Sequence, residues 1–472
     1  MSSHRVNNII PVLAFALAWL VSLQASAGFM PSQSQILSDM VLANSHFTNE
    51  WPTPGCRNCL TGSRPSCIWT RATYIEGALA LFRVNHDPLI YKYATNWGAY
   101  TNWCLRYNLD STDRTPDDQG AGMDYLELYQ LDPTQTQRLT HITNNLNSWV
   151  ARPDVGYLYY VDALHMSMQA FARAGVVLNQ TNYLEKMYDY FHFAKSVIGP
   201  SNGLYSVSDH LWYRDTNFLH GYIASDGTAQ KCYWSRGNGW AFAALARVME
   251  VLPTNDTHYA EYLQTFKEMA AALKAVQRTD GFWNVNLAYT NDFPGPETSG
   301  TSCFTYGMAW GINHGYLDTN TYLPAVIRGW NALANSALHH TNGVDNGFLG
   351  YVQSSGSKPS DGQPVTYTKQ PDFDDFALGL MLLAGSQVYQ LSGPESVMLS
   401  PPTVKTNQVQ LALTVISNLT NGMVNLLETD QLQSDWKTNT TATLSTDIDG
   451  YSYRFTTTNN AGDRFFKARV GL

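Results

Sequence analysis

The sequence has few charged residues and no basic excess. Asp, Glu, Lys and Arg make up 14% of its 472 residues, and the net charge is −9. This low charged fraction, together with 44% hydrophobic residues, argues against disorder and allows a sizeable core. The shortage of basic residues argues against a nucleic-acid partner, which requires basic patches. An acidic ligand would therefore have to meet a local basic group.

Metal-binding patterns are scarce as well. Cys56 and Cys59 form one CxxC pair, but neither a second CxxC pair nor a His pair follows. Zinc sites with this spacing normally have such a second pair, so we expect no metal site. If the chain is exported, the cysteines from Cys56 to Cys104 are instead candidates for a disulfide.

One apolar run is typical of a targeting segment. Arg5 provides a positive flank, residues 9–23 are apolar, and residues 25–27 form a small-residue cleavage site. The run is too short and too interrupted by proline to predict a membrane span, and no Cys follows to carry a lipid anchor. We therefore expect residues 1–27 to be a signal peptide cleaved after Ala27. The mature protein would be secreted or periplasmic, without a membrane span.

Residues 28–393 show a repeated helical pattern. Three amphipathic helices end at a glycine turn, at Gly203, Gly281 and Gly347, where glycine is the expected cap. More apolar helices alternate with amphipathic ones, as the inner and outer helices of a closed toroid would. A polar cluster precedes each of six apolar helices, and these clusters either gather around one mouth or only cap their helices. The clusters begin at Trp69, Asp117, Asp162, Ser235, Glu297 and Asp372.

The composition changes after Pro394. Residues 394–402 include Pro401 and Pro402 and are interpreted as a linker, and residues 403–472 are rich in Thr, Val and Asn. Short alternating runs in this last segment predict the strands of a small β-sandwich-like module. The module carries no recognisable chemistry, so sugar binding, surface attachment and packing against the helical domain all remain open.

Four motifs occur in an order typical of a known family. They are Asp117-Asp118-Gln119, Asp162-Ala163-Leu164-His165-Met166, Trp234-Ser235-Arg236-Gly237-Asn238-Gly239-Trp240 and Pro296-Glu297-Thr298-Ser299-Gly300. Together they resemble glycoside hydrolase family 105, the unsaturated rhamnogalacturonyl hydrolases, and the related family 88 of unsaturated glucuronyl hydrolases. The resemblance extends over residues 51–391, and Arg-Gly-Asn-Gly-Trp is its most specific element.

The resemblance implies a fold and a reaction. The fold would be mainly α, an (α/α)6 barrel of six helical hairpins. The substrate would be an oligosaccharide released by a polysaccharide lyase, for example from the rhamnogalacturonan of pectin, that ends in a Δ4,5-unsaturated uronyl residue. Members of the family remove this residue by adding water across the C4=C5 bond. The resemblance implies no metal and no organic cofactor, and it leaves the oligomeric state open.

The resemblance also assigns roles to charged residues. Asp162 would donate a proton and activate water, which suits a carboxyl whose pKa lies near the working pH; helix capping is the alternative. Asp118 would be the second acid, with Asp117 as the alternative, because successive helical residues do not share a face. Arg236 would bind the uronate, since a guanidinium grips a carboxylate through two hydrogen bonds. Its alternative is a structural ion pair.

Neutral residues of the Arg-Gly-Asn-Gly-Trp region have two interpretations each. Asn238 either bonds to a sugar hydroxyl or shapes a turn. Gly237 and Gly239 suggest a turn that brings the backbone close to the ligand. Trp234 and Trp240 are either stacking surfaces for the sugar or core residues.

Outside that region, His165 either touches the uronate or packs between helices. Tyr160 and Arg214 stand in the region where the leaving-group sugar would be recognised, in segments where relatives carry Trp and His. The leaving group is therefore less constrained than the reaction. Capping is the favoured role for Glu297 and its neighbours.

Two other functions remain compatible with the sequence. A toroid of this kind hosts several chemistries, so a conventional glycosidase or a lyase is the first alternative. A non-catalytic carbohydrate-binding protein with a decayed site is the second.

Overall fold

The computed structural model describes most of the helical region and the strands that follow it. The described residues are 30–55, 67–105, 116–200, 202–368, 375–392, 398–399, 403–405, 408–414, 423–429, 437–446, 452–458 and 465–471. The predicted signal peptide, the Cys56–Cys59 pair and most of the predicted linker lie outside them. The chain divides into two compact units. One contains Asp39–Val388, and the other contains Pro31–Ser38 with Tyr389–Leu472.

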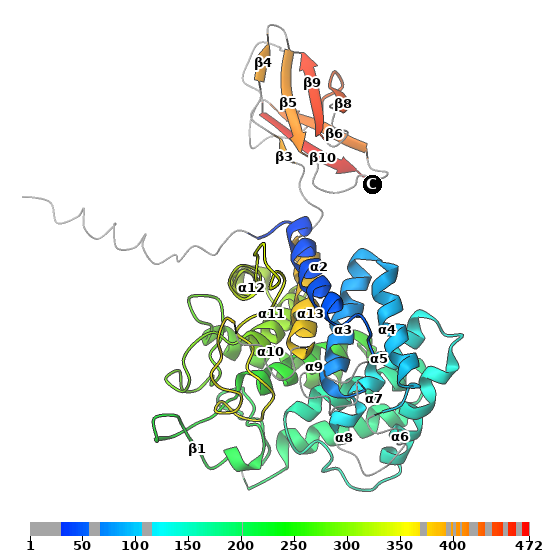
Figure 1. Ribbon diagram of the computed structural model, residues 1–472, viewed down its shortest axis with the longest axis vertical. Coiled ribbons are helices and arrows are strands. Elements are labelled where there is room, and N and C mark those ends of the chain that lie inside the picture. Colours follow the sequence, from blue (N-terminus) through cyan, green and yellow to red (C-terminus); the bar gives the residue numbers. More distant parts are fainter. Residues whose placement is uncertain are drawn as a thin grey trace, which may run out of the picture. The chain divides into compact units, whose positions relative to one another are not determined.

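Helices dominate the first unit and fall into two alternating sets (Figure 1). The inner set is α3 (Trp69–Asn85), α5 (Gly120–Leu131), α7 (Asp162–Val177), α9 (Ser235–Val251), α11 (Thr298–Asn313) and α13 (Asp375–Ser392). The outer set is α2 (Gln33–Glu50), α4 (Pro88–Tyr100), α6 (Thr140–Val150), α8 (Thr181–Ser196), α10 (Tyr259–Ala275) and α12 (Thr319–Ala332). The prediction of a mainly helical chain is therefore confirmed.

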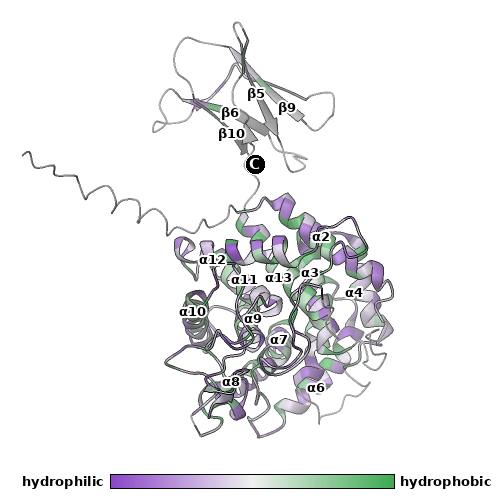
Figure 2. Ribbon diagram, turned by 60° about the vertical axis from the view of Figure 1, so that its left-hand side comes forward, coloured by the Kyte–Doolittle hydropathy of each residue, from purple (hydrophilic) through white to green (hydrophobic). Residues whose placement is uncertain are grey.

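Burial separates the two sets. In α9 every residue from Ser235 to Met249 is buried, whereas α8 buries only one face, with Tyr183, Met187 and Tyr190 at helical spacing. A helix that is apolar all round needs neighbours on every side, and an amphipathic one needs them only along a stripe. Figure 2 shows hydrophilic residues on outer helices such as α4. In the part of the chain that the structure describes, no helix is both long enough and apolar enough to cross a membrane.

The inner helices close into a ring. Each of α3, α5, α7 and α9 packs against the next inner helix along the chain. The ring closes through α13, where Gln387 accepts a hydrogen bond from Asn313 of α11 (2.9 Å). On its other side, Gly379 of α13 meets Gly77 of α3, and a Cβ on either glycine would collide with the other helix's backbone. Glycine is required at this contact because the two backbones touch.

Short elements complete the helical unit. The single-turn helices are η2 (Pro116–Gln119), η3 (Thr136–Leu139) and η4 (Thr216–Phe218), and η5 (Leu333–Ala337) is a π-helical extension of α12. A small hairpin of β1 (Tyr222–Ile223) and β2 (Ala229–Gln230) lies between α8 and α9. Among these elements, η2 matters most for function, because it holds the Asp117-Asp118 pair directly before α5.

The second unit contains antiparallel strands in two sheets. β3 (Met398–Leu399) and β4 (Thr403–Lys405) both pair with β5 (Gln408–Thr414), which continues to β9 (Ser452–Thr458) and β8 (Thr443–Thr446). The other sheet has the order β10 (Phe465–Gly471), β6 (Met423–Thr429), β7 (Lys437–Thr438). The two segments from which strands were predicted, around Ser452 and Phe465, fall in β9 and β10.

Candidate active site

The starts of four inner segments meet at one small cavity of about 70 Å³. It lies where α3, η2, α7 and α9 begin, and it is also reached by the loop before α13. Its lining residues are Trp69, Asp117, Tyr160, Asp162, Met166, Arg214, Arg236, Trp240 and Gly356. Four of the polar clusters expected to surround a common mouth therefore contribute to one cavity or border it.

Asp162 is the first residue of α7 and faces this cavity. Its Oδ2 accepts a hydrogen bond from Arg214 Nε at 3.2 Å, and its side chain is 14% exposed. Burial raises the pKa of Asp162 above its ordinary value; the Arg214 cation opposes the rise, Asp117 adds to it, and Arg236 opposes it. Burial therefore outweighs the two cations, as a proton donor requires. Val161, not Asp162, occupies the N-cap position.

Arg214 is held in place from several sides. Its Nη1 donates to Asp215 at 2.7 Å, and its guanidinium lies over the Tyr160 ring at 4.7 Å from the centroid. Its backbone carbonyl accepts from the N–H of Val161, which joins the segment before α9 to the start of α7 (2.8 Å). Arg214 is thus part of the cavity wall, and its positive charge lies beside the Asp162 carboxyl.

Asp117, and not Asp118, is the member of the acidic pair that lines the cavity. Tyr160 donates a hydrogen bond from its hydroxyl to Asp117 Oδ1 at 2.7 Å. Burial, followed by the neighbouring Asp117 carboxylate, raises the pKa of Tyr160 well above its usual range, so the hydroxyl keeps its proton. Asp118 is buried, only 3% exposed. The sequence-based choice of Asp118 is therefore corrected to Asp117, because the single turn η2 before α5 turns Asp117 toward the cavity.

Arg236 lies in the first turn of α9 and is almost fully buried. Its Nη1 and Nη2 donate to the backbone carbonyls of Gln353 (2.7 Å) and Ser354 (2.9 Å). Its guanidinium also lies between the rings of Trp234 and Phe376, 4.7 and 5.0 Å from their centroids. These contacts tie the 353–356 loop to the start of α9 while the side chain lines the cavity.

Three other predicted residues do not line the cavity. Both amide atoms of Asn238 bind backbone: Oδ1 accepts from the N–H of Trp212 (2.8 Å), and Nδ2 donates to the Trp212 carbonyl (3.0 Å). Trp234 donates from Nε1 to Gln353 Oε1 (2.9 Å). His165 is fully buried beside Glu76. Their side chains build the walls behind the cavity, so a direct contact with sugar does not fit this arrangement.

Gly237 and Gly239 are helical, which differs from the turn we expected. A Cβ on Gly237 would lie 2.8 Å from Val161 Cγ1, and one on Gly239 would lie 2.8 Å from Cys303 Cβ. The glycines therefore let α9 approach α7 on one side and α11 on the other. Their function in the motif is close helix packing.

The Glu297 motif caps a helix, as expected. Glu297 is the N-cap of α11, and its carboxylate accepts from the N–H groups of Ser299 (2.9 Å) and Gly300 (2.7 Å). The carboxylate of Glu297 itself therefore caps α11.

Several functional features had little or no signal in the sequence. Trp69 and Met166 line the cavity, although the sequence assigned no role in the site to either of them. Gly356 also lines it and belongs to no motif. The 353–356 loop reaches the cavity through Arg236, a contact between residues 117 or more positions apart that local pattern does not predict.

The described residues contain no group of three or more His, Cys, Asp or Glu arranged to hold a metal. Cys67 and Cys104, the described members of the predicted disulfide region, form no disulfide with one another. Cys56 and Cys59 lie outside the described residues. A larger cavity of about 860 Å³ between α2 and residues 339–348 has none of the predicted site residues in its lining.

Comparison with known proteins defines the class. The family model described as Glycosyl Hydrolase Family 88 matches residues 40–392. A curated relative, the unsaturated 3S-rhamnoglycuronyl hydrolase of Formosa agariphila, is 28% identical over 341 residues, which cover 68% of this chain and 84% of the relative.

The chain is also similar to several solved structures. A family 88 glycosyl hydrolase from Bacteroides vulgatus has a TM-score of 0.67 and 29% identity over 76% of this chain and 99% of its own. A protein described as a polysaccharide lyase has a TM-score of 0.67 and 27% identity over 76% of this chain and 98% of its own. A family 105 glycoside hydrolase from C. acetobutylicum, 17% identical with a TM-score of 0.58 over 75% of this chain and 99% of its own, shows the shared fold alone.

The ring of helices, and the cavity lined by two carboxyls and two guanidiniums, are those of a glycoside hydrolase with the helical-barrel fold of these relatives. More particularly, the chain belongs to Glycosyl Hydrolase Family 88.

Proposed function

We propose that this enzyme removes a terminal Δ4,5-unsaturated uronyl residue from oligosaccharides by hydrating its C4=C5 bond. The observation that supports the proposal most is that Asp162, Asp117 and Arg236 line one cavity. The cavity thus combines a carboxyl of raised pKa with a guanidinium suited to a uronate. The name of the Formosa agariphila relative points to the same reaction class.

The reaction needs one group that both gives and takes a proton. Protonated Asp162 donates its proton to C4 while a water oxygen bonds to C5, and the resulting carboxylate takes a proton from that water. The product is a hemiketal at C5, which opens by breaking its bond to the ring oxygen. The hemiacetal left at C1 then releases the leaving-group sugar. A raised pKa favours the protonated starting state of Asp162 at mildly acidic pH.

The other lining residues complete the site. Arg236 binds the uronate carboxylate, and Asp117 holds a sugar hydroxyl and keeps the pKa of Asp162 raised. Tyr160 restrains Asp117 through its hydroxyl, and Trp240 provides an apolar wall. Arg214 stabilises the carboxylate of Asp162 after its proton has moved to C4, and it lies at the side where the leaving group would bind. We propose rhamnose for that leaving group, in line with the name of the curated relative.

Absorbance tests this reaction directly, because the conjugated C4=C5 bond absorbs in the near ultraviolet. The purified protein is incubated with lyase-digested rhamnogalacturonan and with lyase-digested rhamnose-containing glycuronan. The proposal predicts that the absorbance of at least one digest falls as free sugar appears. Free sugar with unchanged absorbance would indicate a conventional glycosidase and overturn the proposal.

Three variants test the assignment of the acids, and two of them form a matched pair. Asp162→Asn should abolish turnover while binding stays near normal. Asp117→Asn should lower turnover far more than Asp118→Asn, which changes the adjacent acid outside the cavity. Equal effects of the last two variants would contradict the role given to Asp117.

A second candidate function is polysaccharide lyase activity, favoured by the 27% identical structure described as a lyase. A lyase creates the double bond, so absorbance would rise on undigested polymer. Absorbance followed on digested and on undigested polymer therefore separates the two functions by the sign of the change.

We also propose that the protein is exported after cleavage of residues 1–27, because of their targeting pattern. Sequencing the N-terminus of secreted protein would give residue 28 if this is right. For the second unit, we propose that its two sheets pack face to face as a small sandwich. The predicted linker 394–402 is too long at its end, because Met398 and Leu399 form β3 and pair with β5. A stable, separately expressed 398–472 segment with β-type circular dichroism would support the sandwich.

A further inference from the structure

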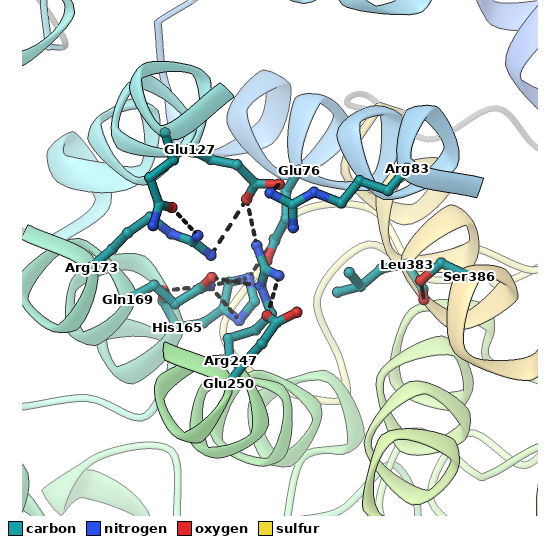
Figure 3. A network of polar contacts seen from close by, with 11 residues as sticks. Glu76, Arg83, Glu127, His165, Gln169, Arg173, Arg247, Glu250, Leu383 and Ser386 are labelled. Atoms are coloured by element: carbon teal, nitrogen blue, oxygen red, sulfur yellow. Dashed lines mark hydrogen bonds and ion pairs between the residues drawn. The ribbon is translucent and has the colours of Figure 1, made fainter. Parts of the chain in front are cut away.

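A network of charged side chains lies between the inner helices of the first unit (Figure 3). Glu76 of α3 lies between two partners: its Oε2 is 3.0 Å from His165 Nε2, and its Oε1 accepts from Arg247 Nε at 2.9 Å. Arg247 continues the network by donating to Glu127 (2.8 Å) and Glu250 (2.6 Å). The network thus joins the inner helices α3, α5, α7 and α9.

The charges in this network balance. Three guanidiniums, from Arg83, Arg173 and Arg247, pair with three carboxylates. Asp124 is also buried here, and neither of its oxygens has a hydrogen-bond partner in the described chain. Burial and then the neighbouring Glu76 and Glu127 raise the pKa of Asp124 well above its usual range, which favours its neutral form. A neutral Asp124 leaves the balance intact.

Stability alone does not account for so many buried charges. Well-packed apolar residues usually stabilise a core as well as or better than buried ion pairs do, because the charges must lose their hydration. What ion pairs add is a defined geometry between the elements they join.

The network reaches the cavity through His165. This residue follows Asp162 by three positions on α7, and Trp240 follows Arg236 by four on α9, so each lies one turn below a residue of the cavity. The imidazole of His165 packs on the Trp240 indole, with centroids 4.7 Å apart and planes at 40°. Trp240 lines the cavity, while His165 does not. Gln169 contacts His165 from the next turn, with its Nε2 3.1 Å from His165 Nε2, and so helps to hold the ring.

We propose that His165 is a positioning residue for substrate binding, and that Glu76 holds its ring so that Trp240 presents a fixed face to the sugar. The inference rests on the proposed function, because it concerns the same cavity. The network on this view preorganises the indole wall before the oligosaccharide arrives, so that the cost of fixing the indole is not subtracted from binding. Its loss should therefore weaken binding more than it slows the chemical step.

The test compares two ends of the same network. His165→Ala removes the ring behind Trp240, whereas Arg83→Met removes a pairing partner of Glu127 at the outer end, where the Arg83 side chain is 39% exposed. Steady-state kinetics on an unsaturated uronyl oligosaccharide should give about a tenfold higher KM with kcat within about twofold for His165→Ala. Arg83→Met should change the unfolding midpoint but leave KM as in the wild type. His165→Phe keeps a ring but loses the hydrogen bonds of His165. Its KM should lie between those of the wild type and His165→Ala.

The outcomes separate this inference from the proposed function. Wild-type turnover tests the proposed function alone, and the KM ratios between variants test the positioning role. The positioning role is overturned if His165→Ala lowers kcat as much as it raises KM, or if Arg83→Met raises KM equally. If His165→Ala does not fold, His165→Phe decides: a KM about threefold above the wild type supports the role, and an unchanged KM overturns it.

Discussion

Replacing Gly237 by alanine tests whether the close approach of α9 to α7 sets the geometry of the cavity. The added Cβ would lie 2.8 Å from Val161 Cγ1 and 3.0 Å from Trp234 Cε3. Carbon atoms prefer separations of about 3.5–4.0 Å. Both overlapping atoms belong to buried side chains with little room to turn, so we expect the start of α7 or of α9 to shift. Val161 directly precedes Asp162, and Gly237 directly follows Arg236. The movement would therefore separate the two groups that the proposed reaction needs together.

The expected magnitudes follow from that overlap. Overpacking a core costs about 1–3 kcal/mol, and alanine in a helix returns up to about 1 kcal/mol relative to glycine. We therefore expect a net loss of about 1–2 kcal/mol in the free energy of unfolding, measured by urea titration. A misplacement of about 1 Å in a catalytic site can cost on the order of 100-fold in rate. We expect kcat/KM to fall about 10- to 100-fold in the absorbance assay.

Two glycine variants serve as controls. Gly156→Ala places its Cβ 3.7 Å from the nearest atom, on Phe193, which is an ordinary contact, so it should match the wild type. Gly239→Ala overlaps with Cys303 at 2.8 Å and presses α9 against α11 instead of α7. It should lose similar stability but less activity. The reasoning is refuted if Gly237→Ala is as stable and active as Gly156→Ala, or if the two overlapping variants lose equal activity.

The remaining predictions concern single interactions in and around the cavity. Because Asp162 must be protonated to react, activity should fall as pH rises through its raised pKa. Arg214→Met removes a cation that lowers this pKa, so it should move the alkaline limb of the kcat/KM profile to higher pH. Asp117→Asn removes an anion that raises it and should move the same limb to lower pH, so two shifts in one direction would contradict the charge assignment. Tyr160→Phe loses the 2.7 Å hydrogen bond to Asp117 and should reduce kcat/KM about tenfold, and an unchanged kcat/KM would show that this restraint is not needed. Glu297→Ala leaves two N–H groups at the start of α11 uncapped and should lower the free energy of unfolding by about 1–3 kcal/mol in urea titration, whereas no loss would mean that the cap is replaced.

The sequence predicted the features that depend on local pattern. Alternating apolar and amphipathic helices and the polar clusters before the apolar ones are visible along the chain, and they place Asp162 and Arg236 at helix starts. Asp162 and Arg236 then share a cavity because consecutive inner helices begin at the same end of the ring.

Features that depend on register or on long-range contacts were not predictable in the same way. The choice between Asp117 and Asp118 depends on how the single turn η2 is oriented before α5. A glycine that opens a turn and one that allows two helices to touch look alike in a sequence, so Gly237 was misinterpreted. The buried partner of His165 lies 89 residues away on α3, beyond the reach of any local pattern.

Opposing effects act on the pKa of Asp162, and their sum is a raised pKa. Arg214 and Arg236 both favour the carboxylate, while burial and Asp117 favour the acid. A bound uronate would engage the charge of Arg236 and so weaken its pull on Asp162. Substrate binding would then raise the pKa of the acid further at the moment when a proton is needed.

The most direct test is a structure of the Asp162→Asn variant with an unsaturated uronyl disaccharide bound. Asparagine keeps the shape of the side chain but cannot donate the proton, so the sugar should remain intact. We predict that the uronate carboxylate lies within hydrogen-bonding distance of the Arg236 guanidinium and that C4 faces residue 162. A sugar bound instead in the larger cavity between α2 and residues 339–348, or one whose carboxylate points away from Arg236, would contradict the account.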